Sequence, residues 1–392
     1  FIIPDSIFAQ DRVNLREFIL KNATIKFIGR FGEKLFKDVN RACAVIICQK
    51  SSPDKNNHID CFRLPPEERK LILKGESNFH DIEKSLSHPV LQSRFLKNNG
   101  YTFNIDLNKS LEITFNKITS AAGILKKHLS STRGVELSKK GMVYQCNHCK
   151  AWSPLSKNDN SSCLKCQTKN AMSSSKVEKI IHPDKGSGRK LLLVGENIHR
   201  YSSKPSLWIN VDKNGINYKS EETYKDEKIV IRKTGIGISA CLDYTGSYTN
   251  QVVYIFKTLN FKIPLEFYLA IINSRLMFFY ITMMNGENEW RSHPYITQGQ
   301  ILNIPIPDVD NLDVDYIKRI KKISTELKKC IAAGKVIPPS LDAKLEKMVA
   351  DFYSMKKSDY KSIYSVIDGS EDLIPVQALK NISIADIFKG RA

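Results

Sequence analysis

The sequence predicts an α/β fold in three successive regions: the closing part of a doubly wound sheet, a mixed α+β region, and a helical carboxyl-terminal region. Three observations support this prediction. A continuous apolar run, RACAVIICQK, follows strand-like and helix-like segments near the amino terminus. Short β-rich runs such as KIVIRKTG and NQVVYIFK alternate with Gly, Asn, Asp and Ser in the middle. Helical periodicity dominates after residue 310.

Residues 1–64 are expected to form a strand, a helix and two further strands. FIIP is strand-like, DRVNLREFILKNA groups its apolar residues on one helical face, and IKFIGRF alternates apolar and polar residues. The apolar run in RACAVIICQKS is typical of a strand buried on both faces. Because FIIPDSIF has the pattern of a buried strand end followed by a turn, we expect the sequence to be the carboxyl-terminal part of a longer protein.

The remaining regions differ in composition. Residues 65–123 are charged and lack a clear period, so we expect a linker with short helices. Residues 124–310 are β-rich, with one strong helix over PLEFYLAIINSRLMFFYIT. Residues 311–392 are expected to be helical, beginning with DVDYIKRIKKISTELKKCIAAG.

The chain carries a large positive charge: 60 Lys and Arg against 41 Asp and Glu give a formal net charge of +19. Such a field favours polyanions, with nucleic acid first and an anionic membrane surface second. Solubility of a lysine-rich protein is the alternative explanation. No run of about 18 apolar residues occurs, so no membrane-spanning segment is expected. Without a secretory signal peptide, and with scattered cysteines typical of reduced thiols, the expected location is the cytoplasm.

Four cysteines form two Cys-x-x-Cys pairs: Cys146, Cys149, Cys163 and Cys166. This spacing matches four thiolate ligands around a tetrahedral Zn²⁺ ion. Disulfides and an iron–sulfur cluster are the alternatives. Since four sulfur ligands leave no open coordination position, we expect a structural zinc ion in a zinc-ribbon insertion at residues 144–170.

Basic residues gather at predicted loop mouths of the β-rich region, in STRGVELSKKG, LLLVGENIHRYSSKPSLWI and KIVIRKTGIGIS. Each segment alone is equally well explained as a solvated loop. Three of them on a basic chain favour contact with DNA phosphates or with guanine in the major groove. The candidate DNA-contacting residues are Arg133, Lys139, Lys140, Arg200, Tyr201, Arg232 and Lys233.

The amino-terminal segment, FIIPDSIF followed by LREFILKNATIKFIGRFGEKLFKDVNRACAVIICQK, resembles the region after the NPPY catalytic motif in adenine-specific DNA methyltransferases. The later segments follow the order of the TaqI-like C-terminal specificity domain: RGVELSKKG, LLLVGENIHRY, KIVIRKTGIGISACLDYTGSYTNQVVYIF, YLAIINSRLMFFYI and ILNIPIP. LDAKLEKMVADFYSMKKSDYKSI resembles the short helical tail of that family. The resemblance extends over residues 1–370, and LAIINSRLMFFY and IPIP are its most specific parts.

The resemblance implies a Rossmann-like methyltransferase domain that ends within residues 1–64, and a target-recognition domain in 124–310 that grips double-stranded DNA. Enzymes of this family, found in restriction–modification and phage-defence systems, flip adenine out of the duplex and methylate it from S-adenosylmethionine. Neither an Asp/Asn-Pro-Pro-Tyr motif nor a Gly-rich cofactor loop occurs in this sequence. Both are expected upstream, so S-adenosylmethionine is expected only with that missing half, and no catalytic residue is assigned.

Three functions stay open at this point. The resemblance favours the target-recognition part of a site-specific adenine DNA methyltransferase, with a methyltransferase or nuclease portion upstream or in a separate chain. The second function is a non-catalytic DNA specificity subunit that docks on a separate methyltransferase chain. The third, a zinc-ribbon nucleic-acid-binding scaffold protein, explains the charge and the cysteines but not the order of the resembling segments.

Overall fold

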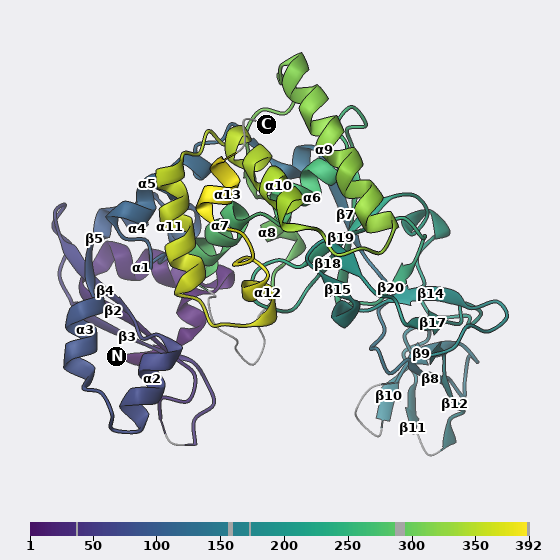
Figure 1. Cartoon of the computed structure of the whole chain (residues 1–392). Coiled ribbons are helices and arrows are strands. Elements are labelled where there is room, and N and C mark those ends of the chain that lie inside the picture. The colour runs from purple at the N-terminus through teal and green to yellow at the C-terminus, as the bar shows by residue number, and fades with distance from the viewer. Residues whose placement is uncertain (37, 156–159, 172–173, 287–294, 390–392) are drawn as a thin grey trace. The chain divides into compact units, whose positions relative to one another are not determined.

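The computed structural model describes residues 1–392 except 37, 156–159, 172–173, 287–294 and 390–392. The chain forms two compact units, each assembled from separate stretches of sequence (Figure 1). Unit 1 consists of Phe1–Ser120, Arg275–Pro294 and Ser354–Lys380. Unit 2 consists of Ala121–Ser274, Tyr295–Tyr353 and Asn381–Ala392. Each unit therefore depends on residues that are distant in the chain.

Unit 1 is built on a mixed sheet of five strands with the order β1-β3-β2-β4-β5. The strands are β1 (Ile2–Pro4), β2 (Thr24–Gly32), β3 (Cys43–Gln49), β4 (His58–Arg63) and β5 (His88–Leu91). In this sheet β2 and β4 are parallel, whereas the other neighbouring pairs are antiparallel. The expected order of strand, helix, strand and strand is present, with α1 (Val13–Asn22) between β1 and β2. That this sheet closes a larger doubly wound sheet stays a prediction.

The prediction that the apolar run of β3 is buried on both faces is wrong for its second half. Ile47 retains 54% of its surface exposed, although Ala44 is fully buried. The edge strand β1 pairs only with Cys43, Ala44 and Val45, so the end of β3 extends beyond its neighbour. The apolar run of β3 therefore belongs to a strand next to the sheet edge and not to a strand buried on both faces.

Residues 65–120, expected as a linker, pack onto this sheet and add β5 to it. Their helices are α2 (Pro66–Leu73), α3 (Phe79–Leu86), α4 (Gln92–Lys97) and α5 (Lys109–Thr119). Unit 1 is completed by α7 (Arg275–Asn285), α11 (Lys357–Asp368) and α12 (Ile374–Gln377). Phe115 of α5 stacks on Tyr280 of α7 with ring centroids 5.7 Å apart, and Lys117 pairs with Asp359 of α11 at 2.7 Å. Three distant segments therefore share one core.

The described residues of unit 2 form three larger sheets and three small strand pairs. The first sheet, with the order β19-β18-β21-β7, joins Ala240–Asp243, Lys228–Arg232, Val253–Thr258 and Leu129–Arg133. The second, β13-β17-β14-β20, joins Ile181–His182, Leu207–Ile209, Lys190–Leu193 and Tyr248–Thr249. The third, β12-β8-β9, joins Val177–Lys179, Met142–Gln145 and Trp152–Pro154. The small pairs are β10 (Asn160–Ser162) with β11 (Lys169–Ala171), β15 (Ile198–His199) with β16 (Ser202–Ser203), and β22 (Pro305–Ile306) with β6 (Gly123–Ile124).

A shared hydrophobic core connects these three sheets. It includes Val143 of β8, Leu192 of β14, Ile209 of β17 and Ile255 of β21, all fully buried. The helices of unit 2 are α6 (Leu265–Ile272), α8 (Gln298–Leu302), α9 (Val314–Ala332), α10 (Pro339–Phe352) and α13 (Ile384–Phe388). The prediction of a helical region after residue 310 is therefore confirmed for the described residues.

The single helix predicted over PLEFYLAIINSRLMFFYIT is wrong: α6 ends at Ile272 and α7 begins at Arg275. Asn273 lies at the break, and its side chain bonds to the start of β19. Its side chain accepts a hydrogen bond from the Ala240 backbone N–H at 3.2 Å and donates one to the Ala240 carbonyl at 2.9 Å. In the described part of the chain, no single helix is long and apolar enough to cross a membrane, and α6 and α7 reach that length only when counted together.

Candidate metal centre and nucleic-acid interface

The two Cys-x-x-Cys segments fold into matching turns in unit 2. The backbone N–H of Lys150 donates to the Cys146 carbonyl at 3.0 Å, and that of Gln167 donates to the Cys163 carbonyl at 2.9 Å. Lys150 and Gln167 both adopt a left-handed backbone, with φ of 59° and 60°. Each turn therefore folds back on itself and directs its two cysteines toward the other turn.

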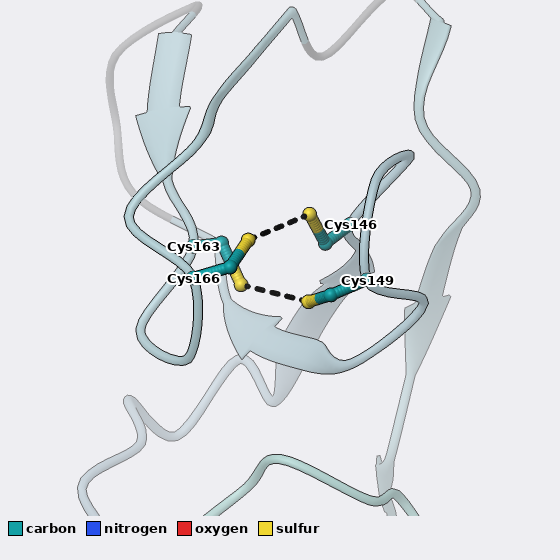
Figure 2. Close-up of side chains that lie close together, drawn as sticks. All are labelled: Cys146, Cys149, Cys163 and Cys166. Atoms are coloured by element: carbon teal, nitrogen blue, oxygen red, sulfur yellow. Dashed lines mark hydrogen bonds between the residues drawn. The ribbon is translucent and has the colours of Figure 1, made fainter.

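The four cysteine sulfurs converge on one point (Figure 2). Cys146 Sγ lies 3.7 Å from Cys166 Sγ, and Cys149 Sγ lies 3.6 Å from Cys163 Sγ. All four sulfur atoms lie within 4.8 Å of one another. A tetrahedron with Zn–S bonds of about 2.3 Å requires sulfur separations of about 3.8 Å. The arrangement therefore fits a single four-coordinate ion, and it leaves no ligand position for a substrate.

Hydrogen bonds around the sulfurs favour thiolates. Those with the Thr168 hydroxyl and backbone N–H lower the pKa of Cys166 to about 5, and the backbone N–H of Cys149 lowers the pKa of Cys146. The Ala151 N–H acts in the same direction on Cys149, but burial and the neighbouring cysteines raise its pKa to about 11. Four thiolates in contact require a cation, because metal binding is coupled to the release of their protons.

The cysteine turns are joined to the body of unit 2 through Trp152 of β9. Lys213 Nζ lies 4.8 Å and Lys176 Nζ 5.6 Å from the centre of its ring, and both lysines pair with Glu178 at 2.6 Å. Gly215 packs directly on its backbone, where an added Cβ would lie 2.6 Å from the Trp152 carbonyl oxygen. An ion held by the four cysteines would order this polar loop and fix it to the β12-β8-β9 sheet.

Five of the seven predicted DNA-contacting residues gather at one end of the β19-β18-β21-β7 sheet. Arg133 ends β7 and pairs with Tyr254 of β21, while Arg232 ends β18 and pairs with Val253 of the same strand. Because β21 lies between β7 and β18, both arginines leave the sheet at the same end. The group is called the basic rim and consists of Arg133, Lys139, Lys140, Arg232 and Lys233.

A pocket of about 240 Å³ opens within the basic rim. Its wall is made by four segments: residues 138–139, residues 194–196, Arg232 with Thr234, and residues 250–252. Lys139 pairs with Glu196 at 2.7 Å, but their side chains are 61% and 58% exposed, so water and salt weaken this pair. Arg232 Nε is buried and has no hydrogen-bond partner among the described residues. These cationic groups are available to an anionic ligand.

Gly134 determines where the loop with Lys139 and Lys140 lies. A Cβ at residue 134 would stand 2.1 Å from the Thr249 carbonyl oxygen, which leaves no room for a side chain. The next residue, Val135, donates its backbone N–H to that oxygen at 2.8 Å. The close approach therefore fixes the start of this loop, and Lys139 lies in the pocket wall.

Arg200 and Tyr201 are placed differently from the prediction. The Arg200 guanidinium makes two bonds to Asp342 of α10, at 3.0 and 2.6 Å, and a third to the Asn273 carbonyl at 2.9 Å. Tyr201 is only 2% exposed. Neither side chain is accessible to DNA, because each is part of the packed interior of unit 2. Both are therefore removed from the candidate interface.

Sequence reasoning missed several polar residues of the same pocket. Gln251 is exposed in the turn before β21, and Ser138 and Thr234 line the wall beside it. Gln298 of α8 accepts a hydrogen bond from Arg133 Nε at 3.3 Å. Asn250 and Gln251 immediately precede an apolar β run. This pattern is typical of a turn, and it could have indicated that these polar residues lie at the end of a strand.

Residues 190–306 match the family model of the TaqI-like C-terminal specificity domain. This region contains β14, β18, β19, β21 and α6, and thus Arg232 and Lys233 of the basic rim; the four cysteines lie before it. No curated protein matches the chain.

Solved structures of restriction–modification enzymes are also similar, at low identity. The type IIL enzyme MmeI, solved in complex with DNA, is 13% identical with a TM-score of 0.49, over 97% of this chain and 50% of that chain. The type IIG restriction endonuclease BpuSI is 12% identical with a TM-score of 0.39, over 99% of this chain and 47% of that chain. The chain thus spans about half the length of these two proteins.

Proposed function

We propose that this chain is the DNA target-recognition part of a site-specific adenine DNA methyltransferase of a restriction–modification or phage-defence system. The observation that carries this proposal is the match of residues 190–306 to a specificity domain. The basic rim lies partly inside this match, on a chain with a net charge of +19. Methyl transfer from S-adenosylmethionine would need the NPPY and Gly-rich motifs, which are absent from this sequence.

Within this proposal the residues of the basic rim divide into two roles. Lys139, Lys140 and Arg133 are exposed and bind phosphates, which positions unit 2 on the duplex without selecting a sequence. Arg232 and Gln251 line the pocket itself and have the side chains that pair with guanine and adenine edges in the major groove. The zinc centre holds the preceding loop in shape and takes no part in chemistry.

The test is a titration of double-stranded DNA by fluorescence anisotropy at about 50 and 200 mM salt, with the variant Lys139→Gln/Lys140→Gln. The slope of log K against log salt is negative, and each lost phosphate contact should reduce its magnitude by about 0.9. The slope of the double variant should therefore be smaller in magnitude by about 2. Lys322→Gln/Lys329→Gln on the exposed face of α9 removes the same charge and is the matched control.

Salt-dependent binding by the native chain, with a lower slope only in the Lys139/Lys140 variant, would support the proposal. If the control variant lowered the slope equally, general charge and not the basic rim would account for binding. A parallel assay follows radiolabelled methyl transfer from S-adenosylmethionine to the same DNA. Transfer by this chain alone would contradict the assignment of methylation to a separate portion.

A further inference from the structure

A second pocket lies entirely within unit 1, apart from the basic rim. Its volume is about 820 Å³, within the range of small-molecule sites. The wall comes from the start of β4, from β5 and α4, and from the first turn of α5, and Figure 1 shows β5, α4 and α5 as neighbours. Nothing in the target-recognition role uses this pocket, so its function is an independent question.

The pocket carries an excess of positive charge. Arg94, Lys97 and Lys109 line it against a single carboxylate, Glu112. Lys97 and Lys109 are exposed and have no partner among the described residues. Cations grouped in a concave, partly apolar wall raise the local concentration of anions. The α5 amino terminus adds a favourable field, although Asn108 already accepts hydrogen bonds from Ser110 N and Leu111 N at 3.0 Å.

Two polar atoms of the wall are buried and without partners. Two backbone carbonyls hold the Arg94 guanidinium: Nη1 donates to the Leu107 carbonyl at 2.6 Å and Nη2 donates to the Asn104 carbonyl at 2.9 Å. Its Nε makes no hydrogen bond to the described residues, and neither does His88 Nε2. Glu112 approaches Nη1 only to 3.9 Å. Burial lowers the pKa of Arg94, so a bound anion would relieve the cost of its charge.

The apolar part of the wall comes from β5, where Pro89 and Leu91 are exposed and Val90 is buried in the core of the sheet; His58, His88, Ser93, Asn108 and Ser110 complete the lining. Leu91 is 40% exposed, so this strip is accessible from solvent. A strip of apolar surface beside a cluster of cations matches a ligand with a flat apolar body and a phosphate. We propose that this pocket binds a nucleotide, with the phosphate against Arg94, Lys97 and Lys109 and the base over the β5 strip. A free nucleotide and a nucleic-acid terminus both present this chemistry.

The experiment is calorimetric titration of the full chain with AMP, with inorganic pyrophosphate and with a mixed-sequence DNA duplex. The test variant is Lys97→Gln/Lys109→Gln, which changes only exposed side chains. Lys74→Gln/Lys84→Gln, on the exposed surface of unit 1, is the matched control. A charged hydrogen bond contributes more than a factor of ten in affinity, so the test variant should bind AMP or pyrophosphate at least about tenfold more weakly.

The outcomes separate the two sources of phosphate. Weakened binding of AMP, with the control within about twofold of the native chain, supports a free nucleotide as ligand. If only duplex binding weakens in the test variant, the phosphate belongs to nucleic acid. Native chain that binds none of the three probes, or a test variant that binds them all as the control does, would overturn the proposal. Because the Lys139→Gln/Lys140→Gln variant leaves this pocket intact, failure here is distinguishable from failure of the target-recognition role.

Discussion

Replacing Arg200 by Met should destabilise unit 2 strongly. The side chains of Arg200 and Asp342 are 10% and 1% exposed, so Arg200→Met removes the bidentate guanidinium from a buried carboxylate. Breaking such a pair costs about 3–5 kcal/mol of unfolding free energy. A domain of 150–250 residues loses about 2–4 °C in Tm for each kcal/mol, so Tm should fall by roughly 6–20 °C.

The assay is thermal unfolding together with DNA titration, and Arg133→Met is the matched control. Arg133 is exposed and lies in the basic rim, so its replacement should leave Tm nearly unchanged while DNA affinity falls. The double variant Arg200→Met/Asp342→Leu should regain most of the lost stability, because it removes the buried carboxylate as well. An Arg200→Met chain with native Tm and weakened DNA binding would refute the structural role assigned to Arg200.

Three further perturbations have defined results. Metal analysis should find one Zn²⁺ per chain, and Cys163→Ser or a strong chelator should release it and expose the remaining ligand thiols to a thiol reagent; full retention of zinc by Cys163→Ser would contradict the ligand set. Gly134→Ala should weaken DNA binding but leave zinc content unchanged, because the added Cβ displaces the loop from Thr249. Burial raises the pKa of Asp106, but the Arg63 charge and hydrogen bonds outweigh it, so the net pKa is lowered. The ionised pair therefore stabilises unit 1 above about pH 4, and this stabilisation is lost as pH falls through the lowered pKa. Asp106→Asn should therefore make Tm depend less on pH below about pH 4. If Tm of the variant fell with acid as steeply as that of the native chain, this role of the pair would be contradicted.

Local patterns in the sequence predicted local structure well. The four cysteines could be identified as a metal site because each pair needs only one turn to present its two sulfurs, and the structure brings all four together. Arg133 and Arg232 were predicted separately, and their proximity depends on β21, which pairs with both strands.

Long-range partners account for what the sequence could not show. Arg200 has the same local features as a loop arginine in contact with DNA, but Asp342 on a distant helix neutralises it. Asn273 was visible as a polar interruption in an apolar run. Its two bonds to Ala240 depend on a residue that no local periodicity identifies.

The strand order β19-β18-β21-β7 also determines when β7 can pair during synthesis on the ribosome. Arg133 of β7 must wait for Tyr254 of β21, roughly 120 residues later, before its ladder can form. At about 5–20 residues per second this delay is about 6–24 s. The cysteine turns need only residues 146–170 and can close around zinc during that interval. A nascent chain could thus complete its cysteine turns while the edge of β7 that faces β21 is still unpaired.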